Sequence, residues 1–156
     1  GIYSDKVHDV KDIPDGATIA IPNDPTNGGR GLLLLQRAGL LKLKDGVGMK
    51  ATPKDVVDNP KHLKFKELEA AQLPRSLADV DAAAITMNYV MSGGLDVKKQ
   101  NIFLEPKDEP LAVMIIAARN KDKDKEAYKA FVKAYQSEAV KKFIADKYKG
   151  TIEPAF

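Results

Sequence analysis

A strand, a loop and a helix follow one another between residues 17 and 38, and this succession constrains the fold more than any other part of the sequence. The apolar pentapeptide "ATIAI" at residues 17–21 ends at Pro22, polar turn residues follow, and four consecutive leucines begin directly after "GGRG". This pattern predicts a strand at 17–21 and a helix at about 28–38 that is closed by Gly39. Such a helix directs its unpaired backbone N–H groups and the positive end of its dipole towards the loop. The loop is therefore a candidate anion site.

Further apolar segments alternate between strand-like and helix-like patterns. Short helices are expected from Thr52 to about Asn59 and after the "LPRS" of residues 73–76. Strands are expected at residues 63–68, 80–86, 102–105 and 111–119. Strands that alternate with helices favour an α/β fold with a mainly parallel sheet, in which ligands gather at the carboxyl ends of the strands.

The last third of the chain has the most regular periodicity. Apolar residues recur at positions i, i+3, i+4 and i+7 in two blocks, which predicts two amphipathic helices separated near Gln136 and Ser137. The two blocks are Tyr128, Phe131, Val132 and Tyr135, and then Val140, Phe143, Ile144 and Tyr148. An aromatic stripe at helical spacing is typical of a packed core, so we assign these residues to packing and not to a ligand site.

Composition and charge exclude several classes of function. The 25 basic and 22 acidic residues are mixed along the chain and leave a net charge of only +3, which is typical of a solvated surface and not of a nucleic-acid-binding one. The absence of cysteine excludes thiol nucleophiles, disulfides and cysteine metal sites. The longest apolar run, residues 111–118, is too short to span a bilayer and predicts a buried strand.

The candidate anion site does not match a nucleotide-binding loop. The stretch "NDPTNGGRG" lacks the lysine of a phosphate-binding loop and the glycine spacing of a dinucleotide fingerprint. Asn27 is placed to cap the helix, and Arg30 lies in its first turn. A planar guanidinium at this position is suited to bind a small carboxylate with two hydrogen bonds. The alternative is that Arg30 forms a salt bridge with a surface acid, and the spacing alone leaves both open.

No catalytic or metal-binding group is visible. His8 and His62 stand alone in polar surroundings, with no further ligand at metal-binding spacing. Glu105 and Glu109 flank Pro106, and such loop carboxylates are normally solvated. Since nothing supplies an activated nucleophile or an oriented base, we expect no enzyme activity, no metal and no cofactor.

Three long segments of the sequence resemble the methionine-binding lipoproteins of bacterial ABC importers. The resemblance covers essentially all 156 residues, and its most specific motifs are "PNDPTN", "ELEAAQLPRS" and "AYQS". It implies an α/β fold of the type II periplasmic binding proteins, with two lobes that close over an amino acid. It also implies a lipid anchor on an N-terminal cysteine, a position in the periplasm or at the cell surface, and delivery of the ligand to a membrane permease.

The resemblance also implies how the chain divides between lobes. Members of that family carry a further segment before the point that matches the beginning of this chain, and we therefore expect the chain to be a fragment. Residues 10–105 would form the second, complete lobe. Residues 1–9 and 106–156 would supply crossing strands and C-terminal helices to the first, incomplete lobe.

By resemblance, five positions of this sequence belong to the ligand site. Asn27 and Arg30 match the carboxylate-binding loop of the family. Thr86 and Val113 stand where the family commonly has asparagines that serve the polar end of the ligand, including its ammonium group. Asn88 is a candidate substitute, and it is equally a candidate helix cap. The expected ligand is methionine or a related small amino-acid carboxylate; the alternatives are a small carboxylate without an α-amino group, or a surface antigen that binds no ligand.

Overall fold

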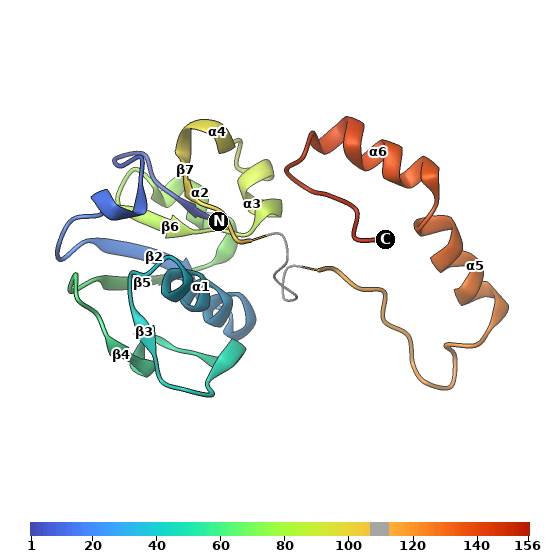
Figure 1. The fold of residues 1–156 in the computed structure, drawn as a ribbon, viewed down its shortest axis with the longest axis horizontal. Coiled ribbons are helices and arrows are strands. Elements are labelled where there is room, and N and C mark those ends of the chain that lie inside the picture. The colour runs from blue at the N-terminus through green and yellow to red at the C-terminus, as the bar shows by residue number, and fades with distance from the viewer. Residues whose placement is uncertain (107–112) are drawn as a thin grey trace. The chain divides into compact units, whose positions relative to one another are not determined.

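The chain forms two compact units in the computed structural model, which describes residues 1–106 and 113–156 (Figure 1). The first unit comprises Gly1–Glu105 and the second comprises Pro106–Phe156. Residues 1–9 belong to the first unit, in which β1 is Ile2–Tyr3. The division of a longer protein into lobes, which rests on the resemblance, stays a prediction.

A five-stranded sheet lies at the centre of the first unit. Its strands are ordered β5-β2-β6-β1-β7 and are β5 (Lys64–Leu68), β2 (Thr18–Pro22), β6 (Ala82–Ala84), β1 and β7 (Asn101–Phe103). Strand β2 pairs in parallel with β5 and β6, whereas β1 is antiparallel to both β6 and β7. Strand β7 therefore runs in the same direction as β5, β2 and β6. The predicted α/β fold with a mainly parallel sheet is confirmed.

Both faces of the sheet are covered, which explains why its strands are continuous apolar runs in the sequence. Alternate residues of each strand point to opposite faces. Ile19 and Ile21 join a buried cluster that includes leucines of α1 (Pro25–Arg37). Ala20 joins a second cluster, formed with α2 (Leu73–Ser76) and α3 (Met87–Ser92). Helix α4 (Val97–Gln100) leads into β7.

Helix α1 begins three residues earlier than the leucine pattern predicts. Pro25 occupies its first turn, and the Asp24 carboxylate accepts a hydrogen bond from the backbone N–H of Asn27 at 2.9 Å. The prediction that Asn27 caps this helix is therefore wrong, because Asp24 and Pro25 form the stronger start signal. Gly39 has φ of +77° directly after Ala38, the C-cap residue of the helix, and the predicted helix end is confirmed.

The glycines of "GGRG" lie inside α1, where they allow close packing. The backbone of the 3₁₀ helix η2 (Gly48–Lys50) crosses α1 at Gly29. A Cβ atom at Gly29 would lie 2.7 Å from the carbonyl carbon of Met49 and closer still to its oxygen. A side chain cannot occupy this position unless one of the two backbone segments moves. The glycine is therefore required by the contact between α1 and η2.

Replacing Gly29 with alanine is expected to reduce the free energy of unfolding by about 1–3 kcal/mol, because the added methyl group overlaps backbone atoms that cannot rotate away. Thermal or urea unfolding followed by circular dichroism measures the effect. Thr26→Ala changes an exposed position of the same helix and is expected to stay within about 0.5 kcal/mol of the unaltered protein. Equal stability of the two variants would contradict the packing argument.

Asp81 joins the beginning of β6 to the beginning of β2. Its carboxylate accepts hydrogen bonds from the Thr18 backbone N–H at 2.8 Å and from Lys6 Nζ at 3.2 Å. The Ser4 hydroxyl donates to the Asp81 carbonyl oxygen at 2.7 Å. The hydrogen bond from Thr18, followed by the interaction with Lys6, lowers the pKa of the Asp81 carboxyl, against the opposing effect of partial burial.

Asp81→Asn is expected to reduce the free energy of unfolding at pH 7 by about 1 kcal/mol, because the charged hydrogen bonds are lost. A lowered pKa in the folded state stabilises the fold above the unfolded pKa of about 3.9, and this stabilisation disappears as the pH falls through the folded pKa. Thermal unfolding is measured at pH values from neutral to strongly acidic. The difference in the free energy of unfolding between the variant and the unaltered protein should become smaller as the pH falls. Asp58→Asn, at an exposed position of β4 (Val56–Asp58), is the control. A difference that stays constant with pH would contradict this account.

The helix predicted from Thr52 is much shorter than expected. Thr52 and Asp55 form a capping box around one 3₁₀ turn, η3 (Pro53–Asp55), and β4 follows at once. Two consecutive valines favour the strand, which pairs with β3 (Lys42–Leu43) in a separate two-stranded sheet. The "LPRS" stretch forms α2 itself and does not precede it. Two further 3₁₀ turns are η1 (Val10–Asp12) and η4 (Ala70–Gln72).

The second unit contains the two predicted C-terminal helices. They are α5 (Glu126–Tyr135) and α6 (Glu138–Tyr148), and Ser137 caps α6 by accepting a hydrogen bond from the Val140 N–H at 3.4 Å. The helices and the break between them are confirmed. Four of their aromatic side chains are exposed, however, and these are Tyr128, Phe131, Tyr135 and Phe143. Two short helices offer no further layer to cover these side chains, and the assignment of the stripe to packing in a longer chain stays a prediction.

The predicted buried strand at 111–118 does not form in the described part of that segment. Residues 111 and 112, and Glu109 before them, lie outside the described residues. Residues 113–119 have no regular secondary structure, and Met114 and Ile115 are 92% and 81% exposed. A strand needs a hydrogen-bonded neighbour, and the described residues of the second unit contain no other strand. Within residues 1–106 and 113–156, no helix is long and apolar enough to cross a membrane.

Candidate functional site

The carboxyl ends of three parallel strands place most of the predicted site residues at one edge of the sheet. Helix α1, with Asn27 and Arg30, follows β2; Thr86 and Asn88 follow β6; and Glu105 follows β7. Such an edge is where ligands bind in open α/β sheets. A Cβ atom at Gly31 would lie 3.3 Å from the Ala84 side chain, which shows how closely the second turn of α1 approaches the end of β6.

Thr86 and Asn88 lie at the beginning of α3. Thr86 has an extended backbone at the N-cap position and makes no side-chain capping bond, and Asn88 lies in the first turn of the helix. Val113 belongs to the second unit, where it is exposed. The roles of Thr86, Asn88 and Val113 in ligand binding stay predictions.

Asp24 occupies the N-terminus of α1. Besides accepting the Asn27 backbone N–H, its carboxylate accepts hydrogen bonds from Asn27 Nδ2 at 3.2 and 3.0 Å. The backbone bond from Asn27 is the main reason that the pKa of the Asp24 carboxyl is lowered. The expectation of unpaired helix N–H groups facing an anion is therefore wrong in part, because Asp24 already accepts from the first turn. The guanidinium of Arg30 stays the candidate group for anion binding at this edge.

Arg30 and Glu105 form a two-pronged ion pair across 75 residues of sequence. Arg30 Nε donates to Glu105 Oε1 at 3.0 Å, and a terminal guanidinium nitrogen of Arg30 donates to Oε2. The side chains are only 26% and 17% exposed. Of the two interpretations left open for Arg30, the structure therefore shows a salt bridge, and binding of a ligand carboxylate stays a prediction. The expectation that Glu105 is a solvated loop carboxylate is wrong, because the end of β7 brings it to α1.

The contact of Glu105 with the candidate site is not predicted by the sequence. Its contact with Arg30 depends on the position of β7 in the sheet, and the strand order is not encoded in any local pattern. The only available signal was its position directly after an apolar strand segment, at the end where ligands gather.

The side chains at this edge of the sheet carry a guanidinium, a carboxylate and amides, and groups of these types bind ligands. Among the described residues, no three side chains of the metal-binding types come together. His62 Nδ1 lies 2.8 Å from Asp15 Oδ1 at an exposed position, and His8 is also exposed. This chemistry is suited to recognise a small polar or charged molecule by hydrogen bonds and ion pairs.

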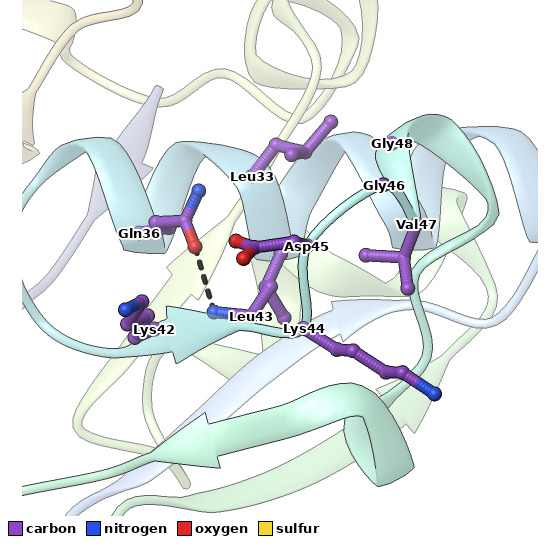
Figure 2. A pocket seen from close by; sticks show the side chains of 9 residues that line it. All are labelled: Leu33, Gln36, Lys42, Leu43, Lys44, Asp45, Gly46, Val47 and Gly48. Atoms are coloured by element: carbon purple, nitrogen blue, oxygen red, sulfur yellow. Dashed lines mark hydrogen bonds between the residues drawn. The ribbon is translucent and has the colours of Figure 1, made fainter.

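A pocket of about 280 Å³ lies elsewhere, between the last turns of α1 and the loop after β3 (Figure 2). Its lining residues are Leu33, Gln36, Lys42, Leu43, Lys44, Asp45, Gly46, Val47 and Gly48. Gln36 Oε1 accepts a hydrogen bond from the Leu43 backbone N–H at 2.6 Å, the dashed line in Figure 2, so this side chain holds β3 against α1. None of the predicted site residues lines the pocket, and we assign it no function.

The sequence profile of NlpA lipoproteins matches residues 1–156, the whole of this chain. The chain belongs to the NlpA lipoprotein family. The D-methionine-binding lipoprotein MetQ of Escherichia coli O157:H7 is 53% identical over 140 residues, which are 88% of this chain and 51% of that protein. Lipoprotein 28 of Escherichia coli K12 is 46% identical over 156 residues, 99% of this chain and 57% of that protein. The resemblance read from the sequence motifs is confirmed.

Solved structures of similar proteins show the same fold. A nutrient-binding protein of Burkholderia cenocepacia, bound to methionine, is 46% identical and matches with a TM-score of 0.87 over 100% of this chain and 66% of its own. The periplasmic substrate-binding protein of an ABC transporter from Coxiella burnetii is 40% identical, with a TM-score of 0.89 over 99% of this chain and 65% of its own. The predicted relation to periplasmic binding proteins is confirmed at the level of the fold.

This NlpA family chain spans about half the length of the two Escherichia coli relatives and about two thirds of the two solved chains. The segment shared with them contains Asn27, Arg30 and Glu105, so the candidate site lies within the matched region.

Proposed function

We propose that the full-length protein is the substrate-binding lipoprotein of an ABC importer, and that it captures methionine or a related small amino-acid carboxylate and delivers it to a membrane permease. The observation that carries this proposal is the placement of Arg30 at the carboxyl edge of the parallel sheet, beside Asn27 and the end of β6. A half-buried guanidinium at such an edge is a strong and specific group for binding a carboxylate.

The relatives support the choice of ligand and of cellular role. One relative with 46% identity has been solved with methionine bound, and another with 53% identity is named as a D-methionine-binding lipoprotein. Both names describe proteins that bind a ligand. We infer that this protein is likewise not an enzyme, that a lipid anchors it to a membrane, and that it works in the periplasm or at the cell surface.

Mass spectrometry of the small molecules released when the purified full-length protein is denatured tests the proposal. The expected result is methionine or a close relative in about one copy per protein, and chiral chromatography then assigns its stereochemistry. Release of a carboxylate without an amino group would assign a different ligand to the same site. Failure to retain or to rebind any small carboxylate would contradict the proposed function.

A further inference from the structure

Glu105 and Arg30 place a negative and a positive side chain next to each other at the carboxyl edge of the sheet. We propose, on the basis of the function proposed above, that Glu105 selects zwitterionic amino acids by accepting the ligand's ammonium group while Arg30 binds the ligand's carboxylate. Glu105 is thereby a specificity-determining residue of the binding site. None of the five positions assigned from the sequence supplies a negative charge that could pair with the ligand's ammonium group.

The geometry of the pair matches the charge pattern of an α-amino acid. Both oxygens of Glu105 lie on one edge of the Arg30 guanidinium, with the Nε to Oε1 distance at 3.0 Å. The two opposite charges are therefore direct neighbours. An α-amino acid also carries its carboxylate and its ammonium on one carbon atom. A single ligand can therefore place its carboxylate against Arg30 and its ammonium against Glu105.

The environment of the pair makes these charges effective in recognition. The side chains are 26% and 17% exposed, so water screens them less than it screens surface charges. A bound zwitterion adds one electrostatic attraction to Arg30, through its carboxylate, and one to Glu105, through its ammonium group. The site then keeps a net charge of zero, and no partly buried charge is left without a partner.

A simple carboxylate gains much less from the same pair. Glu105 already neutralises the charge of Arg30, and the two carboxylates repel each other across the guanidinium. This repulsion discriminates against anions that lack an ammonium group, and such a repulsive element is a common source of specificity. Glu105 also accounts for how the site tolerates Thr86 at a position where, by resemblance, the family commonly has an asparagine.

Glu105→Gln in the full-length protein separates the two parts of the proposal. Calorimetric titration of L-methionine and of its des-amino analogue into both proteins gives four dissociation constants. We expect Glu105→Gln to weaken methionine binding by about tenfold or more and to leave binding of the des-amino analogue unchanged or stronger. The preference for methionine then falls by at least about tenfold, which corresponds to ~1.4 kcal/mol. A structural disturbance alone would weaken both ligands together and leave the ratio of dissociation constants constant.

Two further variants complete the test. Asp58→Asn removes an exposed carboxylate on β4 and should change neither the dissociation constant of methionine nor that of the des-amino analogue. Glu105→Asp keeps the charge on a shorter side chain, and it replaces Glu105→Gln if that variant does not fold. It should weaken methionine binding without weakening binding of the des-amino analogue. An unchanged ratio of the two constants in the Glu105 variant overturns the role of Glu105 while the proposed function stands. If neither ligand binds the unaltered protein, the proposed function fails, and the role of Glu105 fails with it.

Discussion

Arg30→Ala in the full-length protein is expected to weaken methionine binding by about 30-fold or more, equivalent to ~2 kcal/mol, because the ligand's carboxylate loses a charged two-pronged hydrogen-bonding partner. The variant should also be less stable, since Glu105 is only 17% exposed and its carboxylate loses the guanidinium as its partner. Calorimetric titration measures the affinity, and thermal unfolding without added ligand measures the stability.

Two controls separate binding from stability in this experiment. Arg30→Lys keeps the positive charge but loses the planar fork, so it should retain most of the stability and still lose affinity. Arg37→Ala removes an exposed arginine from the last turn of the same helix and should leave the affinity unchanged. A dissociation constant of Arg30→Ala equal to that of the unaltered protein would exclude Arg30 as the carboxylate-binding group.

The 156-residue chain alone is expected to bind methionine at least about 100-fold more weakly than the full-length protein. Ligand sites of this kind bury most of the ligand surface, and the proposed closure of two lobes needs more chain than these residues supply. About one third of each solved relative lies outside the segment matched here. Phe131 and Phe143, exposed on α5 and α6, should also cause the isolated chain to associate.

Parallel calorimetry and light scattering on the two lengths of protein measure these effects. The first unit has its own sheet and two buried apolar clusters, so it should still unfold cooperatively in the short chain. Cooperative unfolding would show that the weaker binding is not caused by a failure to fold. A monomeric 156-residue chain that binds one methionine with full affinity would refute the assignment of residues 106–156 to an incomplete lobe.

Local patterns in the sequence predicted the elements whose signals are themselves local. The run "ATIAI" became β2, Gly39 ended α1 with a positive φ, and Ser137 began α6. In each case one or two neighbouring residues determine the backbone geometry. The leucine pattern predicts a loop at Asp24 and Pro25, although together these residues are a typical helix start and α1 begins there.

Features that depend on tertiary contacts could not be predicted in this way. The glycines before the leucines carry no local signal for their role, which depends on the backbone of Met49 packing against Gly29. The local sequence predicts a solvated Glu105, and it contains no signal of the partner that lies 75 residues away on another element. The apolar residues 113–118 have the composition of a buried strand, yet a strand forms only beside another strand.

A crystal structure of the full-length protein with methionine bound tests the central claim most directly. We predict that the ligand lies at the carboxyl edge of β2, β6 and β7, with its carboxylate oxygens about 2.7–3.2 Å from the guanidinium nitrogens of Arg30. A methionine whose carboxylate is bound by other groups, with Arg30 engaged only by Glu105, would contradict the account.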